Sequence, residues 1–236
     1  MVLYLSYNND MKVHRLLALV FPLLLIASGC VEIIDDLSLN ADGSGTFKYT
    51  VNLSSSKIKI NSILALDTLD GRKVPSLDEI KSDVDRLIKA FKNKDGISEV
   101  SLDANYDDYM FKISCDFNSL LNLQNAIKSV VLEETEYKSL PELDHDWLSL
   151  KENVLERSVP KITIEKTKEI RQADKALLRE GSYTSITRFD KIIDDFRNKN
   201  AMVSKNGMAI MLKTNPYSLI EDQRLLDNTI YLKSDK

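Results

Sequence analysis

Cysteine and histidine are the side chains of this chain best suited to act as nucleophiles or metal ligands, and it has only two of each. They are Cys30, Cys115, His14 and His145. A metal site usually needs three or four converging ligands, and a nucleophilic cysteine needs an activating neighbour. These four residues are too few for such a ligand set, and Cys115 has no activating neighbour in sequence, so the sequence predicts no metal site, no cofactor and no catalytic residue.

The residues before Cys30 form the pattern of a secretory signal peptide. A basic stretch (MKVHR) precedes the apolar run LLALVFPLLLIA, and two small residues then precede the cysteine. A spanning helix needs about 20 apolar residues, so this run is too short to be one. We predict that residues 1–29 are a signal peptide and that translation starts at Met11 rather than at the first methionine.

The end of this segment, IASGC, resembles the lipobox of bacterial lipoproteins. In that family the cysteine receives a diacylglyceryl thioether and becomes the mature N-terminus, which implies lipidation at Cys30. Ala27 stands where leucine is commonest in the family. Each buried methylene of an acyl chain contributes about 0.8 kcal/mol, and more than one chain is needed for stable attachment. The alternative is an ordinary signal peptide, with Cys30 as a free or disulfide-bonded thiol.

The lipobox resemblance also implies a location and a partner. The partner is a membrane, reached through the anchor at Cys30, together with an envelope protein or a lipid. By the sorting rule of enterobacterial lipoproteins, Val31 in place of aspartate favours the outer membrane, on its periplasmic face or at the cell surface.

The composition indicates a globular chain, with 43% hydrophobic and 29% charged residues. The formal net charge of −4 argues against a nucleic-acid partner, because phosphates call for a basic surface. The run Lys161–Glu180 carries both signs, which predicts a solvated face, with a docking surface as the alternative.

Hydrophobic periodicity predicts an α+β fold of antiparallel β-hairpins packed with amphipathic helices. In the region 30–133 the expected strands are 31–39, 45–53, 97–104 and 108–117, and the expected helices are 55–69, the stretch from 77 to the low nineties, and 119–132. Ser76 and Glu79 are predicted to form a capping box at the start of the middle helix.

The remaining chain is predicted to hold an irregular joint and a second α+β region. Residues 134–160 mix acids, two prolines and scattered apolar side chains, so we expect no regular structure there. In the region 161–236, expected to belong to the same domain, we predict strands at 162–164, 183–189, 201–213 and 228–233, and helices from about 170 to Gly181 and near 216–224. The pair Asn206–Gly207 predicts a hairpin within 201–213.

The order hairpin, polar break, helix occurs three times along the chain, starting near residues 31, 97 and 201. The first hairpin contains ADGSGTFKYTV, and with the lipobox it resembles the opening of mature envelope lipoproteins of the LppM type. That resemblance implies an envelope lipoprotein with an α+β domain that contacts lipid or glycolipid.

Cys115 and His145 have side chains that can take part in catalysis or metal binding, but both are interpreted as structural. Cys115 alternates with aromatic residues in YMFKISCDF, which predicts a core position rather than a catalytic thiol. His145 lies between two aspartates in PELDHDWL, and we expect a solvated loop there, with a metal or catalytic histidine as the alternative.

Two further patterns invite a binding hypothesis. The stretch from Asp42 to Gly45 resembles the start of an EF-hand loop, but position twelve would be Tyr49 rather than glutamate, which favours a plain turn. The methionines near the last hairpin fill either the core, which is the commoner use, or an adaptable apolar groove. These methionines are Met202, Met208 and Met211.

The sequence contains no nucleophile elbow, zinc-protease motif, P-loop or dinucleotide fingerprint, so we expect no enzyme. The predicted function is a membrane-anchored lipoprotein of the cell envelope that acts as a binding or interaction module. The alternative is a hydrolase of envelope polymers, since a glycosidase needs only two carboxylates. Converging carboxylates or His145 in a deep cleft would favour the hydrolase. An apolar groove between sheet and helix, without titratable groups, would favour lipid binding, and a closed core with no cleft would favour a protein-interaction role.

Overall fold

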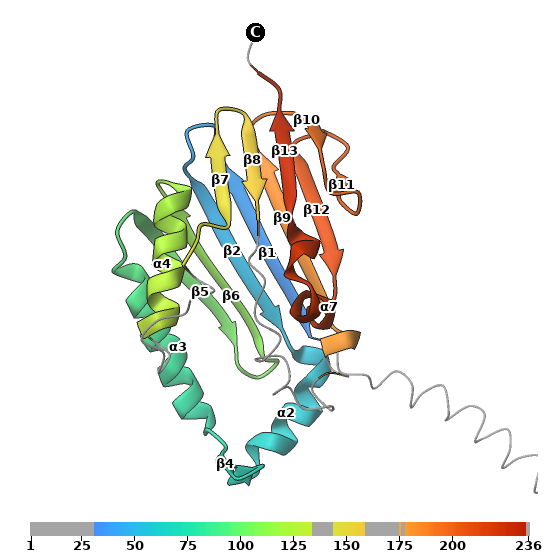
Figure 1. Cartoon of the computed structure of the whole chain (residues 1–236). Helices are drawn as coiled ribbons and strands as arrows, with labels where there is room; N and C mark the ends of the chain where they lie inside the picture. The colour runs from blue at the N-terminus through green and yellow to red at the C-terminus, as the bar shows by residue number, and fades with distance from the viewer. Residues whose placement is uncertain (1–30, 134–143, 159–174, 176–177, 235–236) are drawn as a thin grey trace, which may run out of the picture.

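The computed structural model describes residues 31–133, 144–158, 175 and 178–234, and its largest element is a seven-stranded sheet (Figure 1). The strand order is β11-β12-β9-β1-β2-β6-β5. The bounds are β1 (Glu32–Leu39), β2 (Gly45–Asn52), β5 (Ile97–Asn105), β6 (Met110–Phe117), β9 (Ser182–Phe189), β11 (Met202–Val203) and β12 (Ala209–Thr214).

A second sheet of four antiparallel strands has the order β10-β13-β8-β7. Its strands are β7 (Leu148–Lys151), β8 (Val154–Arg157), β10 (Ile193–Phe196) and β13 (Asn228–Leu232), and a separate hairpin joins β3 (Thr68–Leu69) to β4 (Arg72–Lys73). The helices are α2 (Lys57–Leu64), α3 (Leu77–Lys92), α4 (Leu120–Glu133) and α7 (Pro216–Glu221), with 3-10 turns at Ser54–Ser56 and Gln223–Leu226. The predicted α+β fold class is confirmed.

The centre of the large sheet is a parallel pair, β1 with β9, in register from Glu32 opposite Ser182 to Leu39 opposite Phe189. Every other pair in this sheet is antiparallel. The sheet therefore takes strands from both halves of the chain, which the hairpin-based prediction did not anticipate. Parallel pairing needs a long crossover, and here the crossover includes the β7–β8 hairpin.

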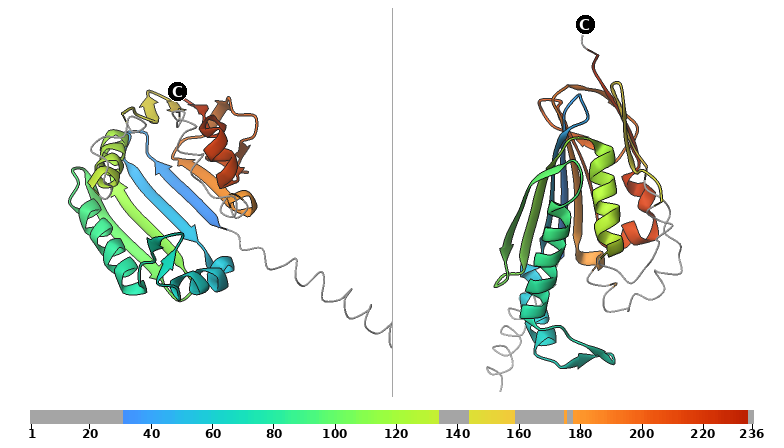
Figure 2. Two further views of the ribbon diagram at one scale, coloured as in Figure 1. Left: turned by 60° about the horizontal axis from the view of Figure 1, so that its bottom comes forward. Right: turned by 90° about the vertical axis from the view of Figure 1, so that its left-hand side faces the viewer.

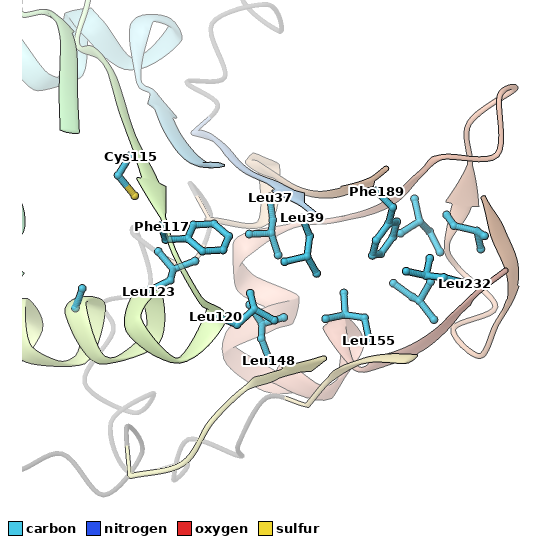
Figure 3. Packing of buried hydrophobic residues seen from close by; sticks show 14 of the residues in the cluster. Leu37, Leu39, Cys115, Phe117, Leu120, Leu123, Leu148, Leu155, Phe189 and Leu232 are labelled. Atoms are coloured by element: carbon cyan, nitrogen blue, oxygen red, sulfur yellow. The ribbon is translucent and has the colours of Figure 1, made fainter. Parts of the chain in front are cut away.

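The core lies on one face of the large sheet (Figure 3). Helices α3 and α4 cover this face beside β5 and β6, and the four-stranded sheet covers it beside β1, β9 and β12 (Figure 2). Since side chains alternate along a strand, residues two apart such as Leu37 and Leu39 both enter the core, where they meet residues of the covering layer. That layer contributes Leu120, Leu123, Leu148, Leu155 and Leu232, among others.

Helix α3 begins as the sequence predicts. The Ser76 hydroxyl accepts a hydrogen bond from the Glu79 amide at 3.2 Å, and Glu79 Oε2 accepts from the Ser76 amide at 2.7 Å. This reciprocal pair is the capping box, and it satisfies two amides that the first turn leaves without helical partners. The buried side chains of Ile88 and Phe91 hold the other end of α3 in the core.

Three local predictions were wrong. The helix expected over 55–69 ends at Leu64, and the β3–β4 hairpin follows, with positive φ angles of 52° and 77° at Asp70 and Gly71. An Asp-Gly pair with positive φ at both positions forms a tight hairpin turn, so the signal was present. The segment 134–160, predicted to be irregular, contains the β7–β8 hairpin, and β10 was not predicted. Strands β8 and β10 pair with β13, which is distant in sequence, and local periodicity does not encode such pairing.

The threefold order of hairpin and helix is confirmed: β1–β2 precedes α2, β5–β6 precedes α4, and β11–β12 precedes α7. The signal peptide with Cys30, the strand expected at 162–164 and most of the helix expected from 170 to Gly181 lie outside the described residues, although residues 178–180 are described and helical. Among the residues that the structure does describe, no helix is both long enough and apolar enough to cross a bilayer.

Candidate functional site

The candidate site is the end of the large sheet where β1 starts, because this end is adjacent to the predicted lipidation residue. Val31 follows Cys30 directly and is buried, and its carbonyl accepts a hydrogen bond from the Ser182 amide at 2.7 Å. A Cβ atom on Gly181 would lie only 2.7 Å from that carbonyl oxygen, so the approach of the two strands depends on this glycine. The first residue after the cysteine is thus already hydrogen-bonded to the sheet.

Helix α2 lies at the same end of the sheet (Figure 1). Glu32, at the start of β1, pairs with Asn52, at the end of β2, and the Asn52 amide donates to the Glu32 carboxylate at 3.2 Å. Asn52 also accepts from the Ser54 amide at 3.0 Å, which turns the chain out of the sheet toward α2. The chain therefore passes from β2 to α2 within a few residues.

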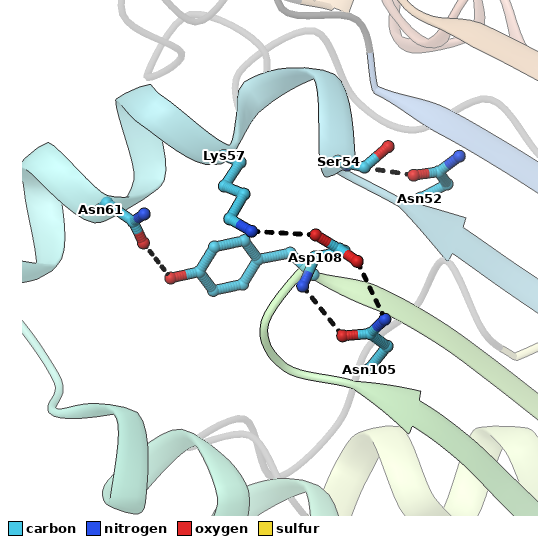
Figure 4. Close-up of polar contacts among 7 residues, drawn as sticks. Asn52, Ser54, Lys57, Asn61, Asn105 and Asp108 are labelled. Carbon is cyan, nitrogen blue, oxygen red and sulfur yellow. Dashed lines mark hydrogen bonds and ion pairs between the residues drawn. The ribbon is translucent and has the colours of Figure 1, made fainter.

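A polar network holds α2 against the turn between β5 and β6 (Figure 4). Lys57 Nζ lies 2.9 Å from Asp108 Oδ1, and Asp108 is held in turn by Asn105 through bonds of 2.9 and 3.1 Å. One helical turn further on, the buried Tyr109 donates its hydroxyl proton to Asn61 Oδ1. The Lys57 ammonium lowers the pKa of Asp108, and the reciprocal contact raises the pKa of Lys57.

The opposite side of α2 is exposed and partly apolar. Ile58 is 85% exposed and Leu66, just beyond the helix, is 46% exposed. Met110, which pairs with Asn52 across β2 and β6, is 40% exposed at the same end. Isolated exposed apolar residues are common, so these three residues mark only a candidate contact surface.

A buried polar cluster joins the two sheets. Arg157 Nη2 on β8 lies 2.9 Å from Asp35 Oδ2 on β1, Arg157 also donates to the Ser185 hydroxyl, and Tyr183 donates to the same Asp35 oxygen. Burial and the Asp35 charge raise the pKa of the Tyr183 hydroxyl. Burial alone would lower the pKa of Arg157, but the Asp35 charge outweighs it and raises that pKa. Arg157 therefore stays charged and Tyr183 keeps its hydroxyl proton, so the cluster acts as a structural clamp.

The cluster leaves little empty space. Beside Arg157 and Asn228 is a void of about 10 Å³, about large enough for one water molecule. Arg157 Nε, Asn228 Nδ2 and Asp35 Oδ1 are buried without a hydrogen-bond partner, so the cluster has two donors and one acceptor left over. A hollow of about 620 Å³ lies at the surface at the other end of the sheet, between the β1–β2 turn, the start of α4 and β7.

Of the residues singled out from the sequence, the structure describes Cys115 and His145, and their surroundings differ. Cys115 is a free thiol only 1% exposed, and burial raises its pKa to about 11, so the thiolate form is strongly disfavoured. His145 is half-buried with its ring centre 6.4 Å from that of Trp147. Its neighbour Asp146 forms an ion pair with Lys128 at 2.7 Å. The described residues contain no group of His, Cys, Asp or Glu that could hold a metal ion.

Two other binding hypotheses have outcomes in the structure. Asp42 accepts hydrogen bonds from the amide and hydroxyl of Ser44, at 2.9 and 2.6 Å, so it closes the predicted turn. Of the two alternatives for the methionines, core filling is not what the structure shows, because Met202 is exposed and Met208 and Met211 are half-buried. Met202 and Met211 pair between β11 and β12, on the face of the sheet opposite the core.

The clamp and the exposed side of α2 were both missed from the sequence. Asp35 does carry a signal, because it shares the inward face of β1 with Leu37 and Leu39, where a carboxylate demands a buried partner. Ile58 and Leu66 gave no such signal, since helical periodicity does not distinguish a face that packs from one that stays open.

Neither a family model nor a curated protein matches this chain. Among solved structures it is similar to the folded domain of LppM from Mycobacterium tuberculosis, determined by NMR. The TM-score is 0.42 and the sequence identity is 8%, over 88% of this chain and 93% of that one.

Proposed function

We propose that this chain is a lipoprotein of the bacterial cell envelope, held to a membrane by acyl chains on Cys30, and that it acts as a non-enzymatic binding module. The observation that carries this proposal is the sequence IASGC after an apolar run of signal-peptide length. The buried position of Val31 is consistent with it, because a mature chain that begins at Cys30 would start directly at the folded sheet.

The immediate start of the sheet has a physical consequence for the tethered protein. Without a linker, the end of the sheet that carries Val31 and Glu32 stays within a few residues' reach of the bilayer. Tethering raises the effective concentration of the domain at the membrane, so weak contacts there become significant. The outer membrane is the proposed location, on the basis of Val31 after the cysteine.

A non-enzymatic role is supported by the state of the buried groups. Asp35 is held by Arg157 and Tyr183, so it is not available as a general acid or nucleophile. The core between the sheet and its covering layer is filled by apolar side chains, and the void beside the clamp holds no more than about one water molecule. A closed core favours contacts made at the surface of the domain.

The test compares the full-length protein with its Cys30→Ala variant, and Cys115→Ala is the matched control. We expect the wild type and Cys115→Ala to fractionate with membranes and to show an intact mass that fits an acylated Cys30 as first residue. Cys30→Ala should be released or left unprocessed. If all three proteins fractionate alike and none carries acyl chains, the proposal is wrong.

A further inference from the structure

The outward side of α2 combines apolar and basic side chains, which is the composition of surfaces that bind at a bilayer interface. Ile58 and Ser62 are four positions apart and therefore lie on one side of the helix, Leu66 follows just after the helix end, and all three are exposed. Ser62 and Ala65 are small, so the two large apolar side chains on either side project beyond them.

The charge of this segment differs from that of the chain as a whole. Residues 57–73 contain four basic side chains and two acidic ones, although the chain has a formal net charge of −4. Lys57 and Lys73 form ion pairs with acidic partners, whereas Lys59 and Arg72 are exposed on the helix and on the adjoining hairpin. A locally basic, partly apolar surface complements a lipid surface with anionic headgroups.

The position of the segment supplies a second, independent argument. Asn52 pairs with Glu32, the second residue after the proposed anchor, and α2 begins five positions after Asn52. Figure 1 shows α2 and the β3–β4 hairpin at the end of the molecule where β1 starts, whereas the C-terminus lies at the opposite end. Figure 2 shows the same hairpin projecting beyond the sheet.

The contacts behind α2 fix its orientation. Lys57 and Asn61 face inward and are held by Asp108 and Tyr109 of the β5–β6 turn. Because the helix is already ordered, contact with a surface costs little conformational entropy. The direction in which Ile58 points is therefore set by the sheet, and not by the tether alone.

We infer that α2 and the β3–β4 hairpin form a membrane-contacting foot, defined as residues 57–73. Its apolar side inserts at the headgroup boundary of the same bilayer that holds the acyl chains, with anionic lipids as the ligand class. This inference rests on the proposed lipid anchor. It goes further than the anchor, because it fixes which end of the domain faces the membrane and which end faces outward.

The experiment places an environment-sensitive fluorophore at Ser62 in the acylated full-length protein. The label is attached to Ser62→Cys in a Cys115→Ala background and compared with the same label at Lys205→Cys. Lys205 is exposed between β11 and β12, near the end of β1 that is remote from the anchor, since Ala209 pairs with Arg188 and Arg188 with Ser38. The protein is reconstituted in vesicles of phosphatidylcholine and phosphatidylglycerol in equal parts, with nitroxides on the lipid chains.

We expect a blue shift and strong nitroxide quenching at Ser62 and neither effect at Lys205. The double variant Ile58→Ser/Leu66→Ser should lose most of the quenching, whereas Leu121→Ser, which removes an exposed leucine of α4, should keep it. Replacing phosphatidylglycerol with phosphatidylcholine should weaken the signal several-fold, because the basic residues then lose their anionic partners.

Each contrary result has a distinct meaning. If the protein is acylated and vesicle-bound but the Ser62 label behaves like the Lys205 label, the foot is wrong and the anchor stands. If the protein carries no acyl chain and stays in solution, the proposed function fails and the inference fails with it. If Ser62 is shielded in native envelopes but not in lipid vesicles, the surface binds a protein, and the inference is overturned.

Discussion

Arg157 and Asp35 form a buried ion pair of 2.9 Å between β8 of the small sheet and β1 of the large sheet, although 122 positions separate them in sequence. It joins the covering layer to the central strand, and Tyr183 and Ser185 complete it from β9. A buried charge of this kind specifies how two layers pack, because any other arrangement leaves a charge unpaired.

Breaking this pair from one side should be costly. We expect Arg157→Met to lower the free energy of unfolding by about 3–5 kcal/mol, because Asp35 is then buried without its counter-charge. Urea unfolding followed by circular dichroism measures the loss. The double variant Asp35→Leu/Arg157→Met should recover most of it.

The matched control is Arg188→Met. Arg188 on β9 is the ion-pair partner of Asp36 on β1, on the face of the large sheet opposite the core. Arg188 is 50% exposed there, so the cost should stay below about 1 kcal/mol. Equal losses for Arg157→Met and Arg188→Met would show that the buried pair has no special part in the packing.

Helix α4 offers a direct comparison of buried and exposed leucines. Leu123→Ala should lower the free energy of unfolding by about 2–5 kcal/mol, because it opens a cavity where α4 packs on the sheet. Leu121→Ala, two positions away and 52% exposed, should change it by no more than about 0.5 kcal/mol. Thermal unfolding of both variants tests this assignment. If the two variants lower the melting temperature equally, Leu123 does not pack in the core as described.

The start of α3 should make stability depend on pH in acid. Lys73, and after it the Ser76 amide, lower the pKa of Glu79 from 4.5 to about 2 in the folded protein. A depressed folded pKa means that the carboxylate stabilises the fold fully above pH 4.5 and loses this effect as the pH falls toward 2. The difference in melting temperature between wild type and Glu79→Gln should therefore be largest at neutral pH and shrink below pH 4.5. A difference that stays constant down to pH 2 would contradict this assignment.

The Tyr109 hydroxyl supplies one of the two side-chain contacts that attach α2 to the β5–β6 turn. Tyr109→Phe removes the bond to Asn61, and we expect a loss of about 1 kcal/mol that is confined to α2. Hydrogen exchange over residues 57–64 should become faster while exchange in β1 and β2 stays unchanged. In the control, Tyr106→Phe, the ring still packs against Phe111 at 5.3 Å between centroids, and α2 should exchange at the wild-type rate. If α2 exchanges at the same rate in both variants, the Tyr109 hydroxyl does not contribute to holding α2 in place.

The sequence by itself determined most of the local elements. Alternation over Phe111 to Phe117 placed Cys115 in the core, and the Ser76–Glu79 spacing located the start of α3. These predictions held because strand alternation and helix capping depend on residues within a few positions of one another. The proposed anchor at Cys30 is likewise a local signal, and it remains a prediction from the sequence.

Only the tertiary structure decided how these elements combine. The parallel pairing of β1 with β9, the four-stranded sheet built from β7, β8, β10 and β13, and the Asp35–Arg157 pair all join residues far apart in the chain. Periodicity shows that a face is apolar, but not which surface covers it. Ile58 stays exposed because Lys57 and Asn61 hold their own side of α2 against the β5–β6 turn. These contacts join elements that are distant in sequence.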